Sequence, residues 1–485
     1  MALSQSGSTR DHWSSRSAFI LAAIGSAVGL GNLWRFPAEA GANGGGAFVL
    51  FYIGCVVLIG LPILLSETLI GRHGQASAPE SVRRVASASR ASPHWDILAS
   101  MGVLAAFLIL SFYCVVGGWV LYYIGVFFVD IFNSGISGGA FTDQSAEQIE
   151  SLFPTMIGSA GWTVGLDALF LGITLYFVAR GVSGGIEFVA KWLMPAFFVL
   201  LILITVYGAF GGAFNQTLEY LFTFEPEKLT GPIMLAALGQ AFFSLSLGVA
   251  GMITYGSYVG RNVNLASTSA LISGADTAVA LIAGLCIFPI VFSAGLSVSA
   301  GPGLMFQTLP HAFQEMPFGS VVGLAFFVMV GFAALTSSVA LLEVPVAWMI
   351  DKFRVVRVFS AIIVGFGALV LGALAALSFN VLSDWHPLDF IPIFEGQGFF
   401  DVLDGLTAKF FMPIGAILTA LFIGWVADRK LVDIENGLGG ALHLTWLALV
   451  RFVCPIALAA ILVVGLLPEE EPAEAPDAAE QVEAE

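Results

Sequence analysis

Long apolar blocks recur along the whole chain, separated by short clusters of Gly, Pro and charged residues. The blocks around 103–129, 197–210 and 456–467 hold almost no charge. With their flanks they are long enough to cross a hydrocarbon layer of about 30 Å as helices. Alternation of apolar and polar residues at every second position, which is typical of strands, is almost missing. The pattern therefore predicts an all-α polytopic membrane protein with eleven transmembrane helices. The predicted spans cover residues 17–41, 46–70, 98–129, 163–181, 188–210, 231–257, 266–296, 318–350, 358–380, 401–426 and 443–467.

Composition agrees with this class. The chain of 485 residues is 58% hydrophobic and only 11% charged, whereas soluble domains carry about 25% charged residues. Its net charge of −16 includes eight acids and no base in residues 469–485. Such a segment is typical of disorder, so residues 468–485 are predicted to form a disordered acidic tail. The charge indicates no nucleic-acid partner.

Positive charge orients the predicted spans. If the N-terminus lies inside, 14 of the 18 Lys and Arg residues fall in cytoplasmic segments, and only Lys228 lies in an outer loop. Cytoplasmic loops carry such an excess of Lys and Arg. We therefore predict a multi-pass protein of the cell inner (plasma) membrane, with the N-terminus cytoplasmic and the C-terminus outside.

Two spans carry glycine and hydroxyl residues at the depth of the bilayer centre. These strings are Gly25-Ser-Ala-Val-Gly-Leu-Gly31 and Ser244-Leu-Ser-Leu-Gly-Val-Ala-Gly251. Unwound backbone is tolerated in lipid only where it faces protein or a wet cavity. Because the two spans are five apart, they predict a 5+5 inverted repeat with discontinuous helices 1 and 6. The alternative is close helix packing through small residues.

The predicted organisation follows from this repeat. Residues 1–16 form a cytoplasmic segment, 17–210 the first five-helix repeat, 231–426 the second repeat, and 443–467 the eleventh helix.

An interrupted helix offers binding groups of both signs. Its free N–H groups attract a carboxylate and its free C=O groups attract a cation. A zwitterionic amino acid with Na⁺ suits such a pair of interruptions. Hydroxyl and amide oxygens in the same apolar stretches can complete a cation site, although Ser and Thr often bond back to their own helix. These residues are Asn32, Ser244, Ser246, Thr336 and Ser337.

Asp276 lies deep in the seventh span. An Asp at the centre of a membrane helix costs about 2.5–3.5 kcal/mol on insertion scales, so it normally faces a cavity or a cation. The alternative is a protonated Asp with a structural role.

The string Gly25-Ser-Ala-Val-Gly-Leu-Gly-Asn-Leu-Trp-Arg-Phe-Pro37 resembles the first-helix signature of the neurotransmitter:sodium symporter family. The strings Gly44-Gly-Gly-Ala-Phe48, Gly239-Gln-Ala-Phe-Phe-Ser-Leu-Ser-Leu-Gly248, Ile253-Thr-Tyr-Gly-Ser-Tyr258 and Ala334-Leu-Thr-Ser-Ser338 follow in the order typical of that family. The resemblance covers residues 10–465 and implies a bacterial amino-acid transporter with the leucine-transporter-like fold and two sodium sites.

The resemblance also implies a site residue by residue. One sodium would bind the carbonyl of Ala27, the side chains of Asn32, Ser244 and Asp276, and the substrate carboxylate. The other would bind the carbonyls of Gly25, Val28 and Ala333 and the hydroxyls of Thr336 and Ser337. The substrate would lie against a set drawn from four spans: Ser26, Ala27, Leu30, Gly31, Ile109, Tyr113, Phe243, Ser244, Ser246, Val249, Ser337 and Leu341.

Gates follow from the same resemblance. Arg35 and Asp404 resemble an outer ion pair, with Phe243 as a lid. Arg10 and Asp351 resemble an inner pair, with Trp13 and Tyr258 beside them. Gly185 and Pro195 resemble an element that lets the inner end of helix 5 unwind.

Two residues bear on chloride. Chloride-dependent relatives have Asn where Asp276 stands and Ser where Ala280 stands, while Tyr52, Gln240 and Ser244 match the rest of their chloride site. A fixed carboxylate at Asp276 can replace the charge of the anion. Chloride is therefore not expected as a cofactor.

The substrate is expected to be a hydrophobic or aromatic amino acid, because Val249, Leu341 and Ile109 are apolar members of the pocket that the resemblance implies. A small sulfonate or a γ-amino acid is the alternative. An ion channel or a non-transporting amino-acid sensor on the same scaffold is the alternative. No nucleophile–base or metal-ligand constellation indicates an enzyme. Nothing in the sequence decides between a monomer and a dimer.

Overall fold

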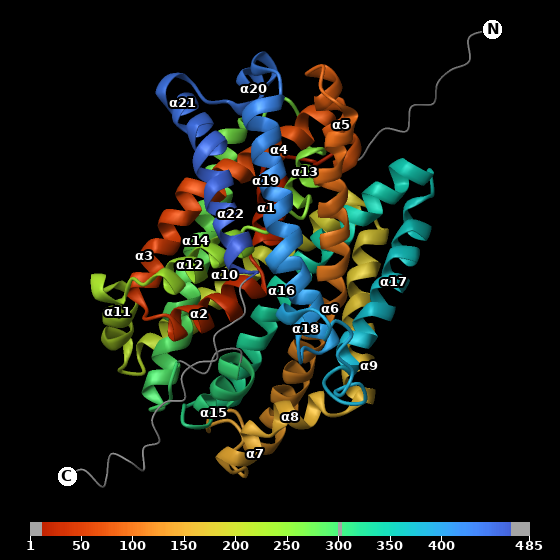
Figure 1. Cartoon of the computed structure of the whole chain (residues 1–485). Helices are drawn as coiled ribbons and strands as arrows, with labels where there is room; N and C mark the ends of the chain where they lie inside the picture. Colours follow the sequence, from red (N-terminus) through yellow and green to blue (C-terminus); the bar gives the residue numbers. More distant parts are fainter. Residues whose placement is uncertain (1–11, 299–302, 467–485) are drawn as a thin grey trace.

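The computed structural model describes residues 12–298 and 303–466, and this part of the chain contains helices and no strands (Figure 1). The helices of the first half are α1 (Arg16–Ala27), α2 (Phe36–Ala42), α3 (Gly46–Cys55), α4 (Leu61–Gly74), α5 (Ala78–Ala88), α6 (Ile97–Ser134), α7 (Ala146–Glu150), α8 (Leu152–Ile157), α9 (Ala160–Ala179), α10 (Glu187–Ala209) and α11 (Phe214–Phe222). Those of the second half are α12 (Gly231–Ser244), α13 (Gly251–Gly256), α14 (Leu265–Ser293), α15 (Leu309–Gln314), α16 (Gly319–Phe353), α17 (Arg357–Leu377), α18 (Phe399–Gly405), α19 (Met412–Leu421), α20 (Arg429–Asn436), α21 (Gly440–Ala448) and α22 (Cys454–Val464).

Each of the eleven predicted spans has a helical counterpart. Within the described residues, nine helices are long and apolar enough to cross a membrane. The pair formed by Arg16–Ala27 and Gly31–Ala42 makes a tenth span bent by 49°. The remaining predicted span, 231–257, is divided between α12 and α13, each too short to cross alone. The predicted discontinuity of helices 1 and 6 is therefore confirmed.

The outer surface of the bundle is apolar. Phe210 on the α10 side, Phe366 on α17 and Ile456 on α22 are each more than two-thirds exposed. In water such a continuous apolar surface would drive association. In a bilayer it faces hydrocarbon, as expected for membrane spans.

The first interruption separates α1 from α2. At Val28 the backbone turns to the extended region, with ψ 110°, and α1 ends. Gly29 has no room for a side chain, because a Cβ there would lie 2.5 Å from the Ser337 hydroxyl and 3.0 Å from that of Tyr113. The helix resumes as a π-helical turn over Gly31–Arg35. The glycines thus let α6 and α16 approach the unwound backbone.

The second interruption runs from the end of α12 to the start of α13. Ser246, Gly248 and Ala250 all have positive φ values, of 50°, 79° and 57°. A Cβ on Gly248 would collide with the carbonyl oxygen of Met412. The Gly248 N–H donates to the Glu67 carboxylate at 2.8 Å. Glu67 therefore satisfies backbone that has left the helix.

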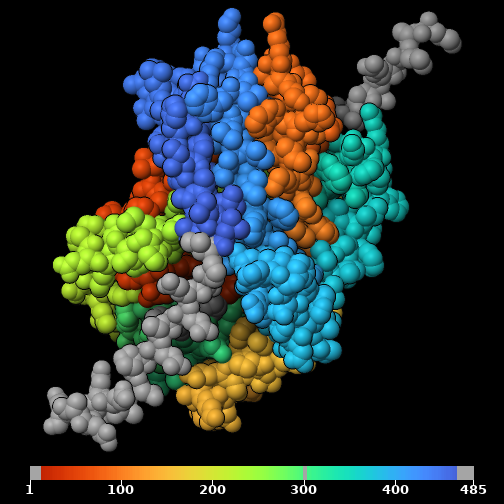
Figure 2. Space-filling model, viewed as in Figure 1, coloured from red at the N-terminus to blue at the C-terminus, as the bar shows by residue number. Residues whose placement is uncertain are grey.

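The two ends of the bundle differ in charge and in the segments that lie over them. Helices α5 and α20 lie at one end, with α7, α8 and α15 at the opposite end (Figure 1). Figure 2 shows that the segment between α17 and α18, coloured light blue, covers this second end together with the gold α7–α8 region. Basic residues gather at the first end, including Arg83, Arg84, Arg429 and Lys430.

Helix α20 is clamped to α4 by one carboxylate. Arg72 donates to the Glu435 carboxylate at 2.7 Å and to the Glu435 carbonyl at 2.5 Å, and His73 lies 3.2 Å from the same carboxylate. Burial raises the pKa of Glu435, but the hydrogen bond from His73 and the charge of Arg72 outweigh it and hold that pKa below its usual value.

Glu435→Gln should lower the free energy of unfolding by about 3 kcal/mol at neutral pH, because it leaves a buried guanidinium without its counter-charge. A depressed folded-state pKa gives stability that is complete above the unfolded value of about 4.3. That stability is lost as the pH falls through the folded value. Thermal unfolding of the wild type and the variant against pH measures the difference. Asp433→Asn, which removes an exposed partner of His443, should have little effect. A deficit in Glu435→Gln that persists at the acid limit would contradict this account.

Candidate functional site

A small chamber of about 40 Å³ lies between the two interruptions. All twelve residues predicted to contact substrate line it, brought together from four spans. Five further residues that were not predicted to contact substrate complete its wall: Gly29, Gly251, Ala340, Val344 and Met412. A space of this size holds a few water molecules, so the walls must move apart to admit an amino acid.

One wall of the chamber offers N–H groups. The outer half of helix 1 begins at Leu30 and Gly31, whose N–H groups have no partner in the preceding helical turn. The Leu30 N–H lies 3.4 Å from the Tyr113 hydroxyl. A carboxylate placed here would meet both the helix start and a phenol donor.

The predicted first sodium site is a connected polar cluster. Asn32, Ser244 and Asp276 are all buried. The Asn32 amide donates to the Asp276 carboxylate at 2.8 Å and to the Ser244 hydroxyl at 3.0 Å. The Ser244 hydroxyl donates to the other carboxylate oxygen at 2.7 Å. The carboxylate therefore draws side chains from helices 1 and 6 together, while the Asn32 amide oxygen accepts from the Gly29 N–H at 3.1 Å.

The residues of the predicted second sodium site also meet. The Ser337 hydroxyl lies 3.2 Å from the Gly25 carbonyl and 3.1 Å from the Val28 carbonyl. The Thr336 hydroxyl donates to the Ala333 carbonyl at 2.9 Å. The Ser337 hydroxyl thus joins the unwound part of helix 1 to helix 8, while the Thr336 hydroxyl bonds to carbonyls of its own helix. Oxygen ligands of this kind suit a hard cation.

A second cavity of about 400 Å³ lies on the side of the chamber where α18 begins. Phe243 and Tyr113 line both cavities and separate them. Arg35 stands over the Phe243 ring, with its guanidinium carbon 4.5 Å from the ring centre. Phe243, the predicted lid, therefore lies between the chamber and the larger cavity.

The predicted outer pair, Arg35 and Asp404, faces this second cavity from opposite walls. The structure does not join them in an ion pair. Arg35 instead pairs with Glu39, one helical turn along, at 3.6 Å.

The opposite side of the chamber is sealed by aromatic residues. Trp13 packs against Tyr255 and Tyr258, with ring centres 5.3 and 6.1 Å away. Its indole N–H donates to the Tyr255 carbonyl at 3.2 Å. Ser14 donates to the carboxylate of Glu187 on α10, with its N–H at 3.1 Å. The chain before α1 is therefore tied across the inner ends of helices 5 and 6.

The predicted inner pair is described only in part, because Arg10 lies outside the described residues. Asp351 accepts a hydrogen bond from the Ser77 N–H at 2.6 Å. Tyr258 donates to Glu343 at 2.6 Å, and Arg357 donates to the same carboxylate at 2.6 Å. Glu343 thus joins the helix-6 and helix-9 sides of the seal.

The family model of the sodium:neurotransmitter symporter family matches residues 10–134 and 140–474. The chain belongs to this family.

Relatives of the symporter align with it in sequence over nearly its whole length. The sodium-dependent transporter YhdH of Bacillus subtilis is 37% identical over 450 residues, which cover 92% of this chain and 95% of the relative. A sodium-dependent transporter of Haemophilus influenzae is 32% identical over 466 residues, covering 94% of this chain and 98% of the relative. The crystal structure of MhsT in complex with L-phenylalanine matches with a TM-score of 0.84 at 41% identity, covering 94% of this chain and 100% of that chain.

These likenesses confirm the predicted fold class and the expectation of a sodium-dependent membrane transporter rather than an enzyme. The chamber is closed around Trp13 on one side and adjoins the larger cavity on the other.

Helix 5 of the symporter is wound at its inner end. Gly185 lies in a π-helical turn, Val182–Ile186, which leads into α10 with Pro195 inside it. A Cβ on Gly185 would collide with the Phe177 carbonyl oxygen. The two residues predicted to permit unwinding are thus in place, in the wound state.

Two acids that bind segments next to the chamber, Glu67 and Glu343, were not among the predicted site residues. Both are buried within apolar spans. The signal that picked out Asp276, an ionisable residue inside a membrane helix, was present at both positions. Applied to every span, it would have found them.

Proposed function

We propose that the symporter imports hydrophobic or aromatic amino acids with Na⁺ by alternating access, without a requirement for chloride. The observation that carries the proposal is the chamber between the interrupted helices. Its lining combines the start of the outer half of helix 1 and the hydroxyls of Ser244 and Ser337 with an apolar wall.

The wall of the chamber supports the substrate class. Ile109, Val249 and Leu341 provide apolar surface, and among the described residues no charged side chain lines the chamber. A charged substrate side chain would be buried there without a partner, at a high cost. MhsT, whose structure holds L-phenylalanine, is a relative with a compatible ligand.

The transport cycle follows from the contacts of the two sodium sites. Na⁺ at Asp276 would hold helices 1 and 6 together and complete the site for the substrate carboxylate. Closure of Phe243 and of Arg35 on Asp404 would then occlude the substrate. Loss of the second Na⁺ would release helix 1 from Ser337, so that the Trp13 seal opens. Each Na⁺ moving through 100 mV supplies about 2.3 kcal/mol.

The two predicted repeats, residues 17–210 and 231–426, would move relative to each other around the chamber. The helix predicted at 443–467 would lie outside both repeats. The end that carries α5 and α20 would face the cytoplasm, as the concentration of Arg and Lys there favours.

Uptake into proteoliposomes tests the function. A radiolabelled aromatic amino acid should accumulate when an inward Na⁺ gradient is imposed, in gluconate as well as in chloride medium. Equal uptake with Na⁺ replaced by choline would overturn the proposal. Uptake that needs Na⁺ but also chloride would overturn the chloride part alone.

Val249→Phe should change substrate size preference. Val249 is buried and faces the chamber, so a phenyl group there would fill the space proposed for a large side chain. We expect kcat/KM for phenylalanine to fall at least about tenfold relative to that for alanine. Competition uptake with the two substrates measures this ratio. An unchanged ratio of kcat/KM values would show that Val249 does not contact the substrate side chain.

A further inference from the structure

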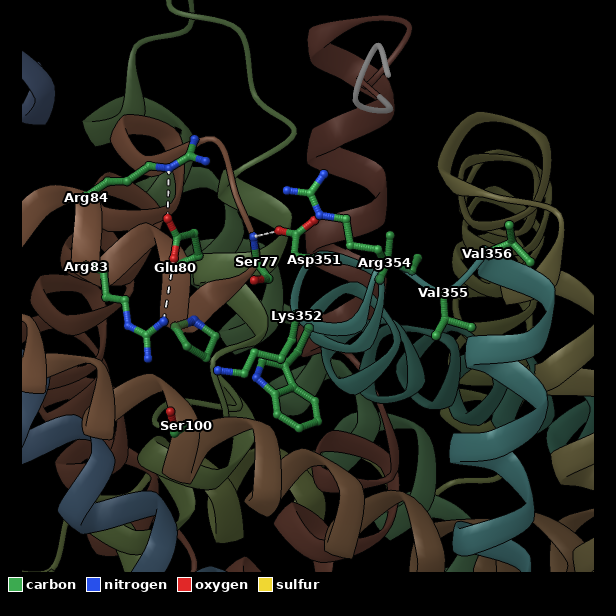
Figure 3. A pocket seen from close by; sticks show the side chains of 13 residues that line it. Ser77, Glu80, Arg83, Arg84, Ser100, Asp351, Lys352, Arg354, Val355 and Val356 are labelled. Carbon is green, nitrogen blue, oxygen red and sulfur yellow. Dashed lines mark hydrogen bonds and ion pairs between the residues drawn. The ribbon is translucent and has the colours of Figure 1, made fainter. Parts of the chain in front are cut away.

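A cavity of about 860 Å³ lies away from the transport chamber, at the end of the bundle that carries α5 (Figure 3). Its walls come from α5, the first turn of α6 and the end of α16 with the turn into α17. Of the residues that line this cavity, only Asp351 was assigned to a predicted gate.

The cavity carries an excess of positive charge. Four basic residues line it, Arg83, Arg84, Lys352 and Arg354, against the two acids Glu80 and Asp351. Asp96 and Glu80 hold Arg83, at 2.5 and 3.8 Å, and Glu80 lies 3.5 Å from Arg84.

Lys352 and Arg354 differ from the other two bases. Neither makes an ion pair within the described residues, and both are exposed. In Figure 3 the Lys352 side chain extends toward Ser100 and the α5 side of the cavity. Two cationic side chains are therefore available to an anion.

An apolar groove of about 350 Å³ adjoins the basic cavity, and Ser100 and Trp348 line both. The groove is bounded by α6, α16 and α17, with Phe107 and Ile363 among its lining residues. Ile363 is half exposed on the outer surface of the bundle. The groove therefore opens toward the hydrocarbon of the bilayer.

We propose that these two cavities together bind one anionic phospholipid, with the phosphate beside Lys352 and Arg354 and an acyl chain in the groove. A soluble anion would use only the basic cavity, whereas an amphiphile fills both. The juxtaposition matches the bilayer, because basic residues lie at headgroup depth next to apolar surface at acyl-chain depth. Such a lipid would bridge α5 and α16 next to Asp351 and Ser77, and so stabilise the sealed inner side.

The test uses the full chain, purified and delipidated, with bound lipid counted by native mass spectrometry and the apparent Tm followed during lipid titration. The probes are dioleoylphosphatidylglycerol, dioleoylphosphatidylcholine and inorganic phosphate. We expect dioleoylphosphatidylglycerol to bind at least tenfold more tightly than dioleoylphosphatidylcholine and to raise the Tm. Inorganic phosphate should not displace it at comparable concentration.

Matched variants locate the site. Lys352→Gln with Arg354→Gln should weaken binding of the anionic lipid at least tenfold, and Ile363→Trp should weaken it by filling the groove. Lys430→Gln, at the same end of the bundle, and Ile362→Trp, an exposed neighbour that does not line the groove, should leave binding unchanged. Sodium-dependent amino-acid binding by each sample reports that it is folded.

Equal affinity for the two lipids, or loss of binding in the controls to the same extent as in the site variants, would overturn the proposal. Displacement by inorganic phosphate would also overturn it, in favour of a soluble anion. A failure of transport in the wild type would leave this measurement unaffected, since lipid binding is read directly.

Discussion

Asp276→Asn should reduce sodium-dependent uptake at least about 30-fold in chloride-free medium. The Asp276 carboxylate accepts from Asn32 at 2.8 Å and from Ser244 at 2.7 Å. Hydrogen bonds to charged groups contribute about 1.5–3 kcal/mol each, and the variant also removes the charge proposed to face Na⁺. Initial uptake rates against Na⁺ concentration measure both the rate and the apparent sodium affinity.

Chloride should restore part of the activity of this variant. The Tyr52 hydroxyl lies 3.5 Å from that of Ser244, and the Gln240 amide donates to the Gly31 carbonyl, next to Asn32, at 2.8 Å. An anion bound there would replace the lost carboxylate charge. If chloride has no effect on Asp276→Asn, the charge-replacement explanation of chloride independence is wrong.

Asp167→Asn is the matched control. Asp167 is likewise buried in a membrane span, on α9, and its carboxylate oxygens accept no hydrogen bond within the described structure. It does not line the chamber. This variant should keep the wild-type dependence on Na⁺, and wild-type uptake by Asp276→Asn would contradict the proposed sodium site.

Gly248→Ala should abolish measurable transport and lower the free energy of unfolding by about 3 kcal/mol. At φ 79° an alanine is strained, and its Cβ would collide with the Met412 carbonyl. Relief requires the interruption to move, which would break the 2.8 Å hydrogen bond to Glu67. Uptake and the apparent Tm of the purified variant measure the two effects.

Gly239→Ala provides the comparison. Gly239 lies in α12, nine residues earlier, and a Cβ there would meet nothing within 4 Å. Alanine also favours a helix relative to glycine. This variant should therefore be at least as stable as the wild type. A loss of stability equal to that of Gly248→Ala would show that the effect does not depend on the backbone conformation at Gly248.

Membrane spans and their interruptions were predictable because they depend on local sequence. A long uncharged run predicts a helix, and glycine with hydroxyl residues at mid-depth predicts unwound backbone. The strings at Gly25 and Ser244 therefore located both interruptions. The family resemblance supplied the set of residues that line the chamber.

Contacts between distant segments were not predictable from local pattern. Glu67 and Gly248 are 181 positions apart, and no periodicity relates them. For Arg35, the resemblance pointed to Asp404, but in this structure the guanidinium pairs with Glu39, one helical turn away. The state of a gate depends on conformation, which a residue pattern does not specify.

Equilibrium binding of a radiolabelled aromatic amino acid to the detergent-solubilised protein, titrated with NaCl and then with choline chloride, is the most direct test of the central account. If peptide groups freed at Val28 and beyond Ser244 hold cation and zwitterion jointly, binding should be saturable in Na⁺ and negligible in choline. Equal affinity in both salts would show that the unwound segments do not bind the two ligands together.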